Sequence, residues 1–283
     1  MAEILKGAPV AAAITEDLKA RSQALKAHGK VPCLAVLRVG DRPEDMAYER
    51  GALKRCEKIG IRTVGFLLPA DCTQEELIKV IGQINDDNDI HGCLMFRPLP
   101  EQLDEKAACD ALTPRKDVDS MTSASLCRVF TGRGDGFLPC TAQSCIELLD
   151  HYSVKIAGKR AVIIGRSLVI GRPVAMALLE RDATVTICHS KTENLAKICS
   201  EADILIAAVG RVGTVDKTFV NPDQVVIDVG INATPDGGIC GDVKFDEVSG
   251  LVRAITPVPA GVGSVTTAVL CKHVIEAAEK SAK

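Results

Sequence analysis

The feature that most constrains this chain is a short apolar run that enters a glycine-containing loop and continues into a helix-forming segment. The run from Ala161 to Ile164 is rich in β-branched residues, the loop starts at Gly165, and Pro173 opens an Ala- and Leu-rich segment. This order predicts a strand, a tight turn and a helix, because glycine permits a sharp turn and proline has the backbone angle of a first helical turn. The turn is either a phosphate-binding loop, facing the positive end of the helix dipole, or an ordinary strand-to-helix connection.

The glycine spacing of this loop departs from the dinucleotide-binding pattern G-x-G-x-x-G, because a serine stands in the second glycine position. If the loop binds a nucleotide, we expect the contacts to come from Gly165, Arg166, Ser167 and Gly171.

Apolar runs alternate with helix-forming segments along the whole chain, which is typical of α/β proteins with parallel sheets. In the first half the pattern predicts helices at 9–28, 44–58 and 73–85 and strands at 32–40, 62–68 and 92–96. The periodicity fails between 117 and 136, where we expect a long loop that borders a cleft. A second strand-helix series from about 160 to 229 predicts a Rossmann-like, doubly wound parallel sheet.

Composition excludes several classes of function. Aromatic residues make up 3% of the chain, tryptophan is absent, and the net charge is −3 without a basic tract, so a nucleic-acid partner is not expected. Apolar runs are far shorter than a membrane span, and the start lacks the apolar core of a signal peptide, so we expect a cytoplasmic protein with no membrane partner. The 12 cysteines form no C-x-x-C pair, so no metal site is expected.

The second strand of the second series indicates which nucleotide would be bound. An NAD-binding domain usually carries an acidic residue at the end of that strand, but here the strand ends Cys188-His189-Ser190-Lys191. Ser190, Lys191 and Arg166 could instead surround a 2′-phosphate, which favours NADP over NAD. The later strands end in Val209-Gly210 and Val229-Gly230-Ile231, either as structural turns or as cofactor contacts, so Ile231 is a further candidate.

Several segments together carry a resemblance to one family. In chain order, the sequence resembles the methylenetetrahydrofolate dehydrogenase/cyclohydrolase family, the FolD-type enzymes, at Lys116-Asp117-Val118-Asp119, Pro139-Cys140-Thr141, Gly165-Arg166-Ser167 with Gly171-Arg172-Pro173, Gly241-Asp242-Val243, and Pro257-Val258-Pro259 with Gly261-Val262-Gly263.

The resemblance implies two α/β domains that face each other across a cleft, with the C-terminal helix returning to the first domain. The folate-binding catalytic domain would comprise residues 1–140 and 265–283, and the NADP-binding domain residues 141–264. The family oxidises 5,10-methylenetetrahydrofolate with NADP, normally hydrolyses the product to 10-formyltetrahydrofolate, and is usually homodimeric. Tyr48 would stack on the aminobenzoyl ring of the folate and Asp119 would bind the pterin edge, both as catalytic and substrate-binding residues, while Pro257 and Gly261 would also contact substrate.

The sequence departs from the family at the folate site. The family motif S-x-x-Y-x-x-x-K reads here with Ala52 in place of the lysine, and Phe96 replaces the glutamine that partners it. We therefore expect a competent dehydrogenase whose cyclohydrolase step is weak, absent, or rescued by Lys54 or Arg97. Lys54 lies about 200° around a helix from position 52 and cannot simply replace the lysine. Smaller departures are Ser120, Ala142, Ala260, Ser264 and Val265.

Two alternatives fit the same sequence. A catalytically silent folate- and NADP-binding protein would share the fold, although the retained nucleotide loop argues against it. A shikimate-type two-domain dehydrogenase would share the second domain, but the Lys-Asp-Val-Asp and Pro-Val-Pro segments match the folate enzymes better.

Overall fold

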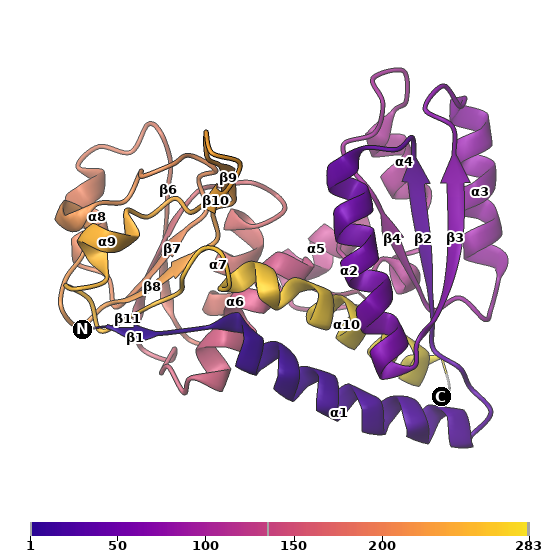
Figure 1. The fold of residues 1–283 in the computed structure, drawn as a ribbon, viewed down its shortest axis with the longest axis horizontal. Coiled ribbons are helices and arrows are strands. Elements are labelled where there is room, and N and C mark those ends of the chain that lie inside the picture. The colour runs from indigo at the N-terminus through magenta and orange to yellow at the C-terminus, as the bar shows by residue number, and fades with distance from the viewer. Residues whose placement is uncertain (1, 135, 282–283) are drawn as a thin grey trace. The chain divides into compact units, whose positions relative to one another are not determined.

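The computed structural model describes residues 2–134 and 136–281, which form two compact units (Figure 1). The large-sheet unit comprises the described part of 1–12 together with Thr141–Thr266. The small-sheet unit comprises 13–140 and the described residues from Thr267 onward. The C-terminal helix thus belongs to the same unit as most of the first half of the chain.

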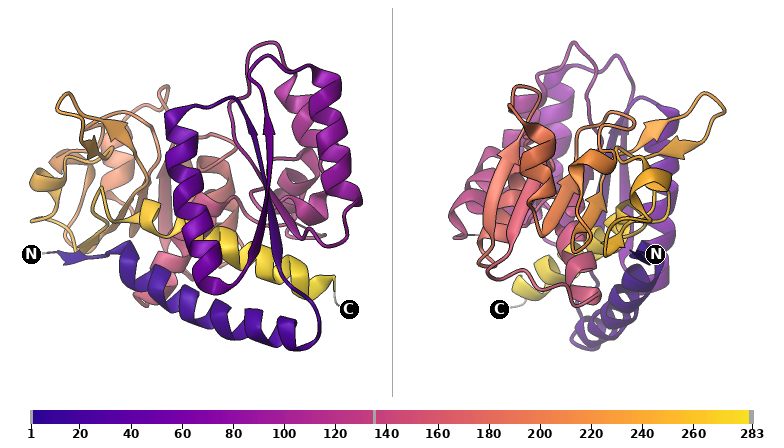
Figure 2. Two further views of the ribbon diagram at one scale, coloured as in Figure 1. Left: turned by 45° about the vertical axis from the view of Figure 1, so that its right-hand side comes forward. Right: turned by 90° about the vertical axis from the view of Figure 1, so that its left-hand side faces the viewer.

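The small-sheet unit is built on three parallel strands in the order β3-β2-β4. The strands are β2 (Cys33–Val39), β3 (Arg62–Leu68) and β4 (Gly92–Met95). The helices are α2 (Pro43–Ile59), α3 (Gln74–Asp86), α4 (Glu105–Ala111) and α5 (Ser123–Thr131), together with most of α1 (Gly7–Ala27) and α10 (Thr266–Lys280). Figures 1 and 2 show α2 and α3 on opposite sides of this sheet, the arrangement that right-handed crossovers impose.

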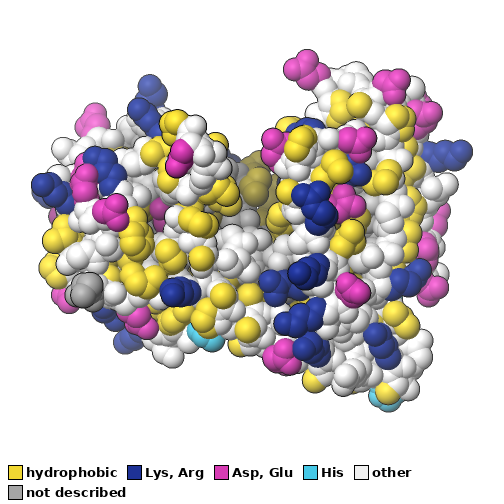
Figure 3. Space-filling view, viewed as in Figure 1, with side chains coloured by type: hydrophobic (Ala, Val, Ile, Leu, Met, Phe, Trp, Pro, Cys, Tyr) yellow, Lys and Arg dark blue, Asp and Glu magenta, His cyan; other side chains and the backbone are white. Residues whose placement is uncertain are grey.

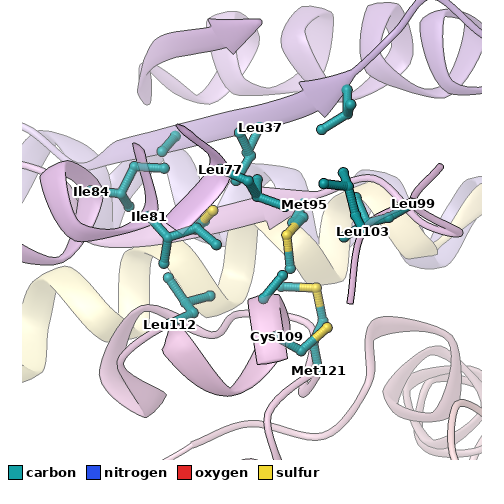
Figure 4. Packing of buried hydrophobic residues seen from close by; sticks show 14 of the residues in the cluster. Leu37, Leu77, Ile81, Ile84, Met95, Leu99, Leu103, Cys109, Leu112 and Met121 are labelled. Carbon is teal, nitrogen blue, oxygen red and sulfur yellow. The ribbon is translucent and has the colours of Figure 1, made fainter. Parts of the chain in front are cut away.

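Alternate residues of β2 point to the two faces of the sheet. Leu37 on one face packs in a buried cluster with Leu77 and Ile81 of α3 and with Met95 of β4 (Figure 4). Arg38, the next residue, points to the α2 side, where its Nε donates to Glu49 at 3.0 Å. β2 is buried along its whole length, as expected for a central parallel strand.

The large-sheet unit contains a six-stranded parallel sheet in the order β1-β11-β8-β7-β5-β6. The strands are β1 (Glu3–Ile4), β5 (Arg160–Ile164), β6 (Thr184–Cys188), β7 (Ile204–Ala207), β8 (Val225–Asp228) and β11 (Ala254–Ile255), with a separate hairpin of β9 (Asn232–Ala233) and β10 (Ile239–Cys240). The helices are α6 (Cys140–His151), α7 (Gly171–Leu179), α8 (Leu195–Ser200) and α9 (Phe245–Val248). Strand order reverses at β5, so the prediction of a doubly wound sheet is confirmed.

The prediction of a long loop between 117 and 136 is wrong, because helix α5 occupies the middle of this segment. The Thr122 side chain accepts from the Ser125 backbone N–H at the start of α5, and Gly132 ends the helix in a left-handed conformation with φ 66°. The sequence did not predict this helix because serine and threonine are as common in turns as at helix starts. Within the described residues, no helix is long and apolar enough to cross a bilayer.

Candidate active site

The glycine loop lies at the point where the strand order of the large sheet reverses. It follows β5, whose neighbours are β6 and β7. Gly165 has φ 126°, and a Cβ there would collide with the carbonyl oxygen of Ala208, just beyond β7. A Cβ on Gly171 would in turn collide with the Gly165 carbonyl. Both positions therefore require glycine, and the loop folds tightly over the carboxyl ends of the strands, where ligands bind in open α/β sheets.

Ser167 organises the loop that leads into α7. Its Oγ accepts from the backbone N–H groups of Ile170, at 3.1 Å, and Gly171, at 3.4 Å. The hydroxyl thus shapes the approach to the helix at the position where the usual pattern has a glycine. The N–H groups of Gly171 and Arg172 donate to the hydroxyl and the carbonyl of Ser167, and Pro173 has none, so an anion at this end would be attracted by the positive end of the helix dipole.

The three candidates for the 2′-phosphate of the nucleotide lie on neighbouring loops. Arg166 follows β5, Ser190 and Lys191 follow β6, and all three are exposed. The two strand ends are joined directly, since the Gly165 N–H donates to the Cys188 carbonyl at 2.9 Å. No acidic side chain occupies the segment from Cys188 to Lys191, so the negative charge that would repel a 2′-phosphate is missing there.

Two buried aspartates hold the loops after β7 and β8, and sequence reasoning did not assign them a role. The carboxylate of Asp242 accepts from the backbone N–H groups of Val209, Gly210 and Arg211 at 2.6 to 2.9 Å, and from the side-chain amide of Asn232 at 3.0 Å. Asp242 is fully buried. The signal in the sequence was the acid between glycine and valine in Gly241-Asp242-Val243, because a buried charged residue must find hydrogen-bond donors.

Asp228 ends β8 and forms the second of these anchors. Its carboxylate accepts from the backbone N–H groups of Gly230, Asp242 and Val243 at 2.9 to 3.0 Å. Burial raises the pKa of Asp228 to about 6, although the three N–H donors favour its charged form. The signal in the sequence was an aspartate directly after a wholly apolar strand.

The Pro-Val-Pro loop lines a pocket of about 290 Å³ within the large-sheet unit. Pro257, Gly261 and Ile231, three of the predicted contact residues, lie together in its wall. Ile231 exposes 66% of its surface, which leaves an apolar side chain available to a ligand. A Cβ on Gly261 would collide with the Pro257 carbonyl, so the loop needs glycine there.

The small-sheet unit carries the remaining candidates. Tyr48 lies on α2 and is 37% exposed, and its ring meets the ring of Phe96 edge-on with centroids 6.2 Å apart. Ala52, one helical turn after Tyr48, is completely buried. Where the family motif has a lysine and a glutamine, this chain therefore has a buried methyl group and an aromatic ring.

The cations near these positions are engaged elsewhere. Arg55 donates to the hydroxyls of Thr15 and Thr267 at 2.9 and 2.8 Å. Arg97 approaches Glu105 at 3.8 Å. Lys54 is exposed and lines a shallow depression with Thr63, and Figure 3 shows Lys and Arg side chains spread over the exposed surface around α2.

The Lys-Asp-Val-Asp segment divides between structural and candidate functional residues. Lys116 donates to three backbone carbonyls at the end of α3, those of Ile84, Asn85 and Asp87. The buried Asp117 accepts from the N–H groups of residues 121 and 122. Asp119 accepts from the Cys140 N–H at 2.8 Å, and burial raises its pKa, while that hydrogen bond and the charge of Arg97 act in the opposite direction.

No group of three or more His, Cys, Asp or Glu side chains that could hold a metal ion occurs in the described ranges.

Comparisons with known proteins cover nearly the whole chain. Residues 5–119 match the family model described as "Tetrahydrofolate dehydrogenase/cyclohydrolase, catalytic domain", and residues 139–282 match its NAD(P)-binding domain. A curated relative from Carboxydothermus hydrogenoformans, "Bifunctional protein FolD", is 54% identical over 281 residues, which is 99% of this chain and 98% of the relative. A FolD protein of Clostridioides difficile is 50% identical, over 97% of this chain and 96% of that protein.

Solved structures of similar fold include enzymes of the same family. The bifunctional FolD enzyme of Campylobacter jejuni superposes with a TM-score of 0.96 at 39% identity, covering 99% of each chain. The Trypanosoma brucei enzyme, solved with NADP cofactor and inhibitor, gives 0.93 at 34% identity over 100% of this chain and 99% of that chain. Shikimate 5-dehydrogenase from Listeria monocytogenes shares the fold alone, with a TM-score of 0.52 at 12% identity over 88% of this chain and 96% of that one.

Proposed function

The chain belongs to the tetrahydrofolate dehydrogenase/cyclohydrolase family, and on that premise we propose an NADP-dependent methylenetetrahydrofolate dehydrogenase whose cyclohydrolase step is weak or absent. The first reaction moves a hydride from the one-carbon unit of 5,10-methylenetetrahydrofolate and leaves 5,10-methenyltetrahydrofolate. The second would add water to that cation and give 10-formyltetrahydrofolate.

The two reactions require different kinds of catalysis from the protein. The folate nitrogens stabilise the cation left by hydride loss, so the dehydrogenase step needs alignment more than acid or base help. NADP, when bound, supplies the hydride acceptor. Hydrolysis needs an activated water and stabilisation of developing charge, which requires a polar or basic side chain beside the reacting carbon.

The nucleotide-binding residues support the first reaction. In our proposal the loop of Gly165, Ser167 and Gly171 holds the pyrophosphate near the positive end of α7, and Arg166 and Ser190 hold the 2′-phosphate. The residues present fit NADP because the required glycines and the positive helix end coincide at one loop, and because no acid lies in the segment from Cys188 to Lys191 at the end of β6. Ile231 would pack against the nicotinamide end of the cofactor.

The second part of the proposal concerns the residues that would contact the folate. Tyr48 keeps a partly exposed ring for stacking on the aminobenzoyl group, and Asp119 offers a carboxylate to the N–H donors of the pterin. Pro257 and Gly261 would contribute the wall of the Pro-Val-Pro pocket.

One observation carries the proposal of a weakened cyclohydrolase. Ala52 is completely buried and Phe96 lies edge-on against Tyr48, so an apolar pair takes the two positions where the family has lysine and glutamine. The partners of Arg55 and Arg97 direct their charges to threonines and to a glutamate. Loss of a positioned acid or base lowers a rate by about 10²- to 10⁴-fold.

The test measures both steps on the same protein. NADPH formation from methylenetetrahydrofolate reports the dehydrogenase, and the decay of added methenyltetrahydrofolate above the uncatalysed rate reports the cyclohydrolase. We expect rapid NADPH formation, little enzyme-dependent decay, and a gain in decay in the double variant A52K/F96Q. The variant K54A serves as a matched control and should leave both rates unchanged. Decay catalysed by the unaltered protein as fast as its NADPH formation would contradict the proposal.

The dehydrogenase measurement also separates this function from a silent folate- and NADP-binding protein, which would give no NADPH. We propose a homodimer, supported by the family resemblance, and light scattering should give twice the mass of one chain. The cytoplasmic location stays a prediction from the sequence.

A further inference from the structure

The small-sheet unit has a second cavity, at the opposite end of its sheet from Tyr48 and Phe96. Its volume is about 470 Å³, within the range of small-molecule sites. His91 lies in its wall just before β4, and the His91 Nδ1 accepts from the Cys33 N–H at the start of β2, at 3.2 Å. Phe96, by contrast, directly follows the carboxyl end of β4. This cavity is therefore separate from the candidate folate site.

The wall of this cavity is positively charged although the chain as a whole is acidic. It contains Arg115, Lys116 and Lys280, and no acidic residue is among its described lining residues. An adjoining pocket of about 390 Å³ shares Thr113 and Arg115 and adds two further arginines, at 128 and 133, again without an acid among the described residues. The carboxylates of Asp86, Asp87 and Asp89 lie close enough to influence Lys116 or His91 but do not line either pocket.

Two buried N–H groups in these walls lack an acceptor. The Nε2 atom of His91 and the Nε atom of Arg128 are shielded from solvent and have no hydrogen-bond partner among the described residues. Because the Nδ1 of His91 accepts a hydrogen bond, the ring proton lies on Nε2, which is therefore a donor. Both atoms are out of reach of water, so neither donor faces the open volume of a pocket, and His91 and Arg128 contribute to the walls behind it.

The cations differ in what they can offer. Lys116 has its ammonium group bound to three carbonyls and contributes charge alone. Lys280 lies over the Phe137 ring at 4.9 Å and can turn toward a ligand at low cost, since it is exposed. Arg115 is exposed where the two pockets meet, and its planar guanidinium can bind two oxygens of one anion.

We propose that this cavity binds the phosphate group of a small organic phosphate, at a site distinct from the folate and NADP sites. Arg115 would hold the phosphate from the shared rim, with Lys280 beside it. A cavity of this size has room for an organic portion beyond the phosphate, along the apolar surface of Ile90 and Ala277.

The test uses the full chain saturated with NADP, so that the nucleotide site is already filled. Isothermal titration with glycerol 3-phosphate should show one further site, and acetate should bind at least tenfold more weakly. R115S should weaken glycerol 3-phosphate binding by about tenfold, the value of one charge-assisted hydrogen bond. The matched control R253S, at an exposed arginine of the other unit, should bind like the unaltered protein.

A second measurement uses the imidazole of His91, in the wall of the cavity, to report ligand binding. It needs no substitution that could disturb folding. In NMR spectra of protein labelled with ¹⁵N at histidine, the Nε2–H signal of His91 should shift on addition of glycerol 3-phosphate and stay in place with acetate. Absence of binding at millimolar concentration, equal binding of acetate, or equal affinity in R115S would each overturn the proposal. An unchanged His91 signal at saturation would overturn it as well.

Discussion

The carboxylate of Asp242 provides the sharpest test of how the fold positions the nucleotide loops. One of its oxygens accepts from the N–H groups of Val209 and Gly210, and the other accepts from Arg211 and Asn232. The substitution Asp242→Asn keeps the shape but replaces one acceptor oxygen with an NH₂ group, which then faces two donors. Two charge-assisted hydrogen bonds are lost, and two like groups are placed in contact.

The expected cost follows from these contacts. A hydrogen bond to a charged group contributes roughly 1.5 to 3 kcal/mol, so two are worth about 3 to 6 kcal/mol. Residues 209–211 are exposed, so water can satisfy the released N–H groups, and we expect the lower end, about 3 kcal/mol. The same change frees the loop after β7, where the Ala208 carbonyl packs against Gly165, so the KM for NADP should rise more than kcat falls.

Urea unfolding followed by circular dichroism measures the free energy, and NADPH formation at varied NADP measures the KM. Asp236→Asn is the control, because Asp236 is exposed and its carboxylate accepts from the Thr234 hydroxyl in the same turn, so its effect should stay within about 0.5 kcal/mol. If Asp242→Asn cost less than about 1 kcal/mol and left the KM for NADP unchanged, a single buried carboxylate would not be what holds these loops.

Three further outcomes are expected. Ala260→Gly should raise the free energy of unfolding by about 0.5 kcal/mol in urea titrations, because φ is 80° at Ala260, whereas Ser120→Gly, at φ 54°, should give no gain because the Ser120 hydroxyl donates to the Phe137 carbonyl. Gly165→Ala should abolish NADP binding measured by calorimetry, since its Cβ would meet the Ala208 carbonyl. Burial lowers the pKa of His273 to about 4 from 6.5, so NMR should find the imidazole neutral at pH 5. The free energy of unfolding should therefore fall by about 1.4 kcal/mol per pH unit as the pH drops from 6.5 toward 4, because the unfolded chain binds the proton more readily. A fitted pKa near 6.5 would contradict this.

The elements that the sequence predicted well are those whose own residues specify them. Strand β3 runs from Arg62 to Leu68 as expected, and the helix expected at 73–85 forms as α3, with Thr73 and Glu76 making a capping box at its start. The glycine loop was recognisable because strand, turn and helix each carried a local signal. In each case the hydrogen-bonding or packing need is met within a few residues of the chain.

The features that the sequence did not reveal depend on distant partners. Strands β1 and β11 have two residues each and exist because β11 pairs with β1 on one side and with β8 on the other. These pairings join segments far apart in the chain, and strands this short have no periodicity to detect. Asp228 and Asp242 carried no sign of their partners in the sequence, and only the folded chain brings backbone amides from three segments, 209–211, 230 and 242–243, onto them. Nothing local distinguishes such a carboxylate from a solvated one.

The glycine loop and the positions of Ala52 and Phe96 have different freedom to change, and this explains why the family pattern is kept at the loop and lost at the other two positions. At Gly165 and Gly171 the backbone itself occupies the space of a side chain, so almost any substitution disrupts the loop. At positions 52 and 96 the family pair is polar, and changing one member alone would leave the other buried without its partner, at a cost of several kcal/mol. Replacing both by Ala52 and Phe96 avoids that cost, since the aromatic ring packs against Tyr48. A paired apolar replacement can therefore remove a hydrolytic site while the dehydrogenase loop stays intact, and for this reason activity should return only when both positions are changed together.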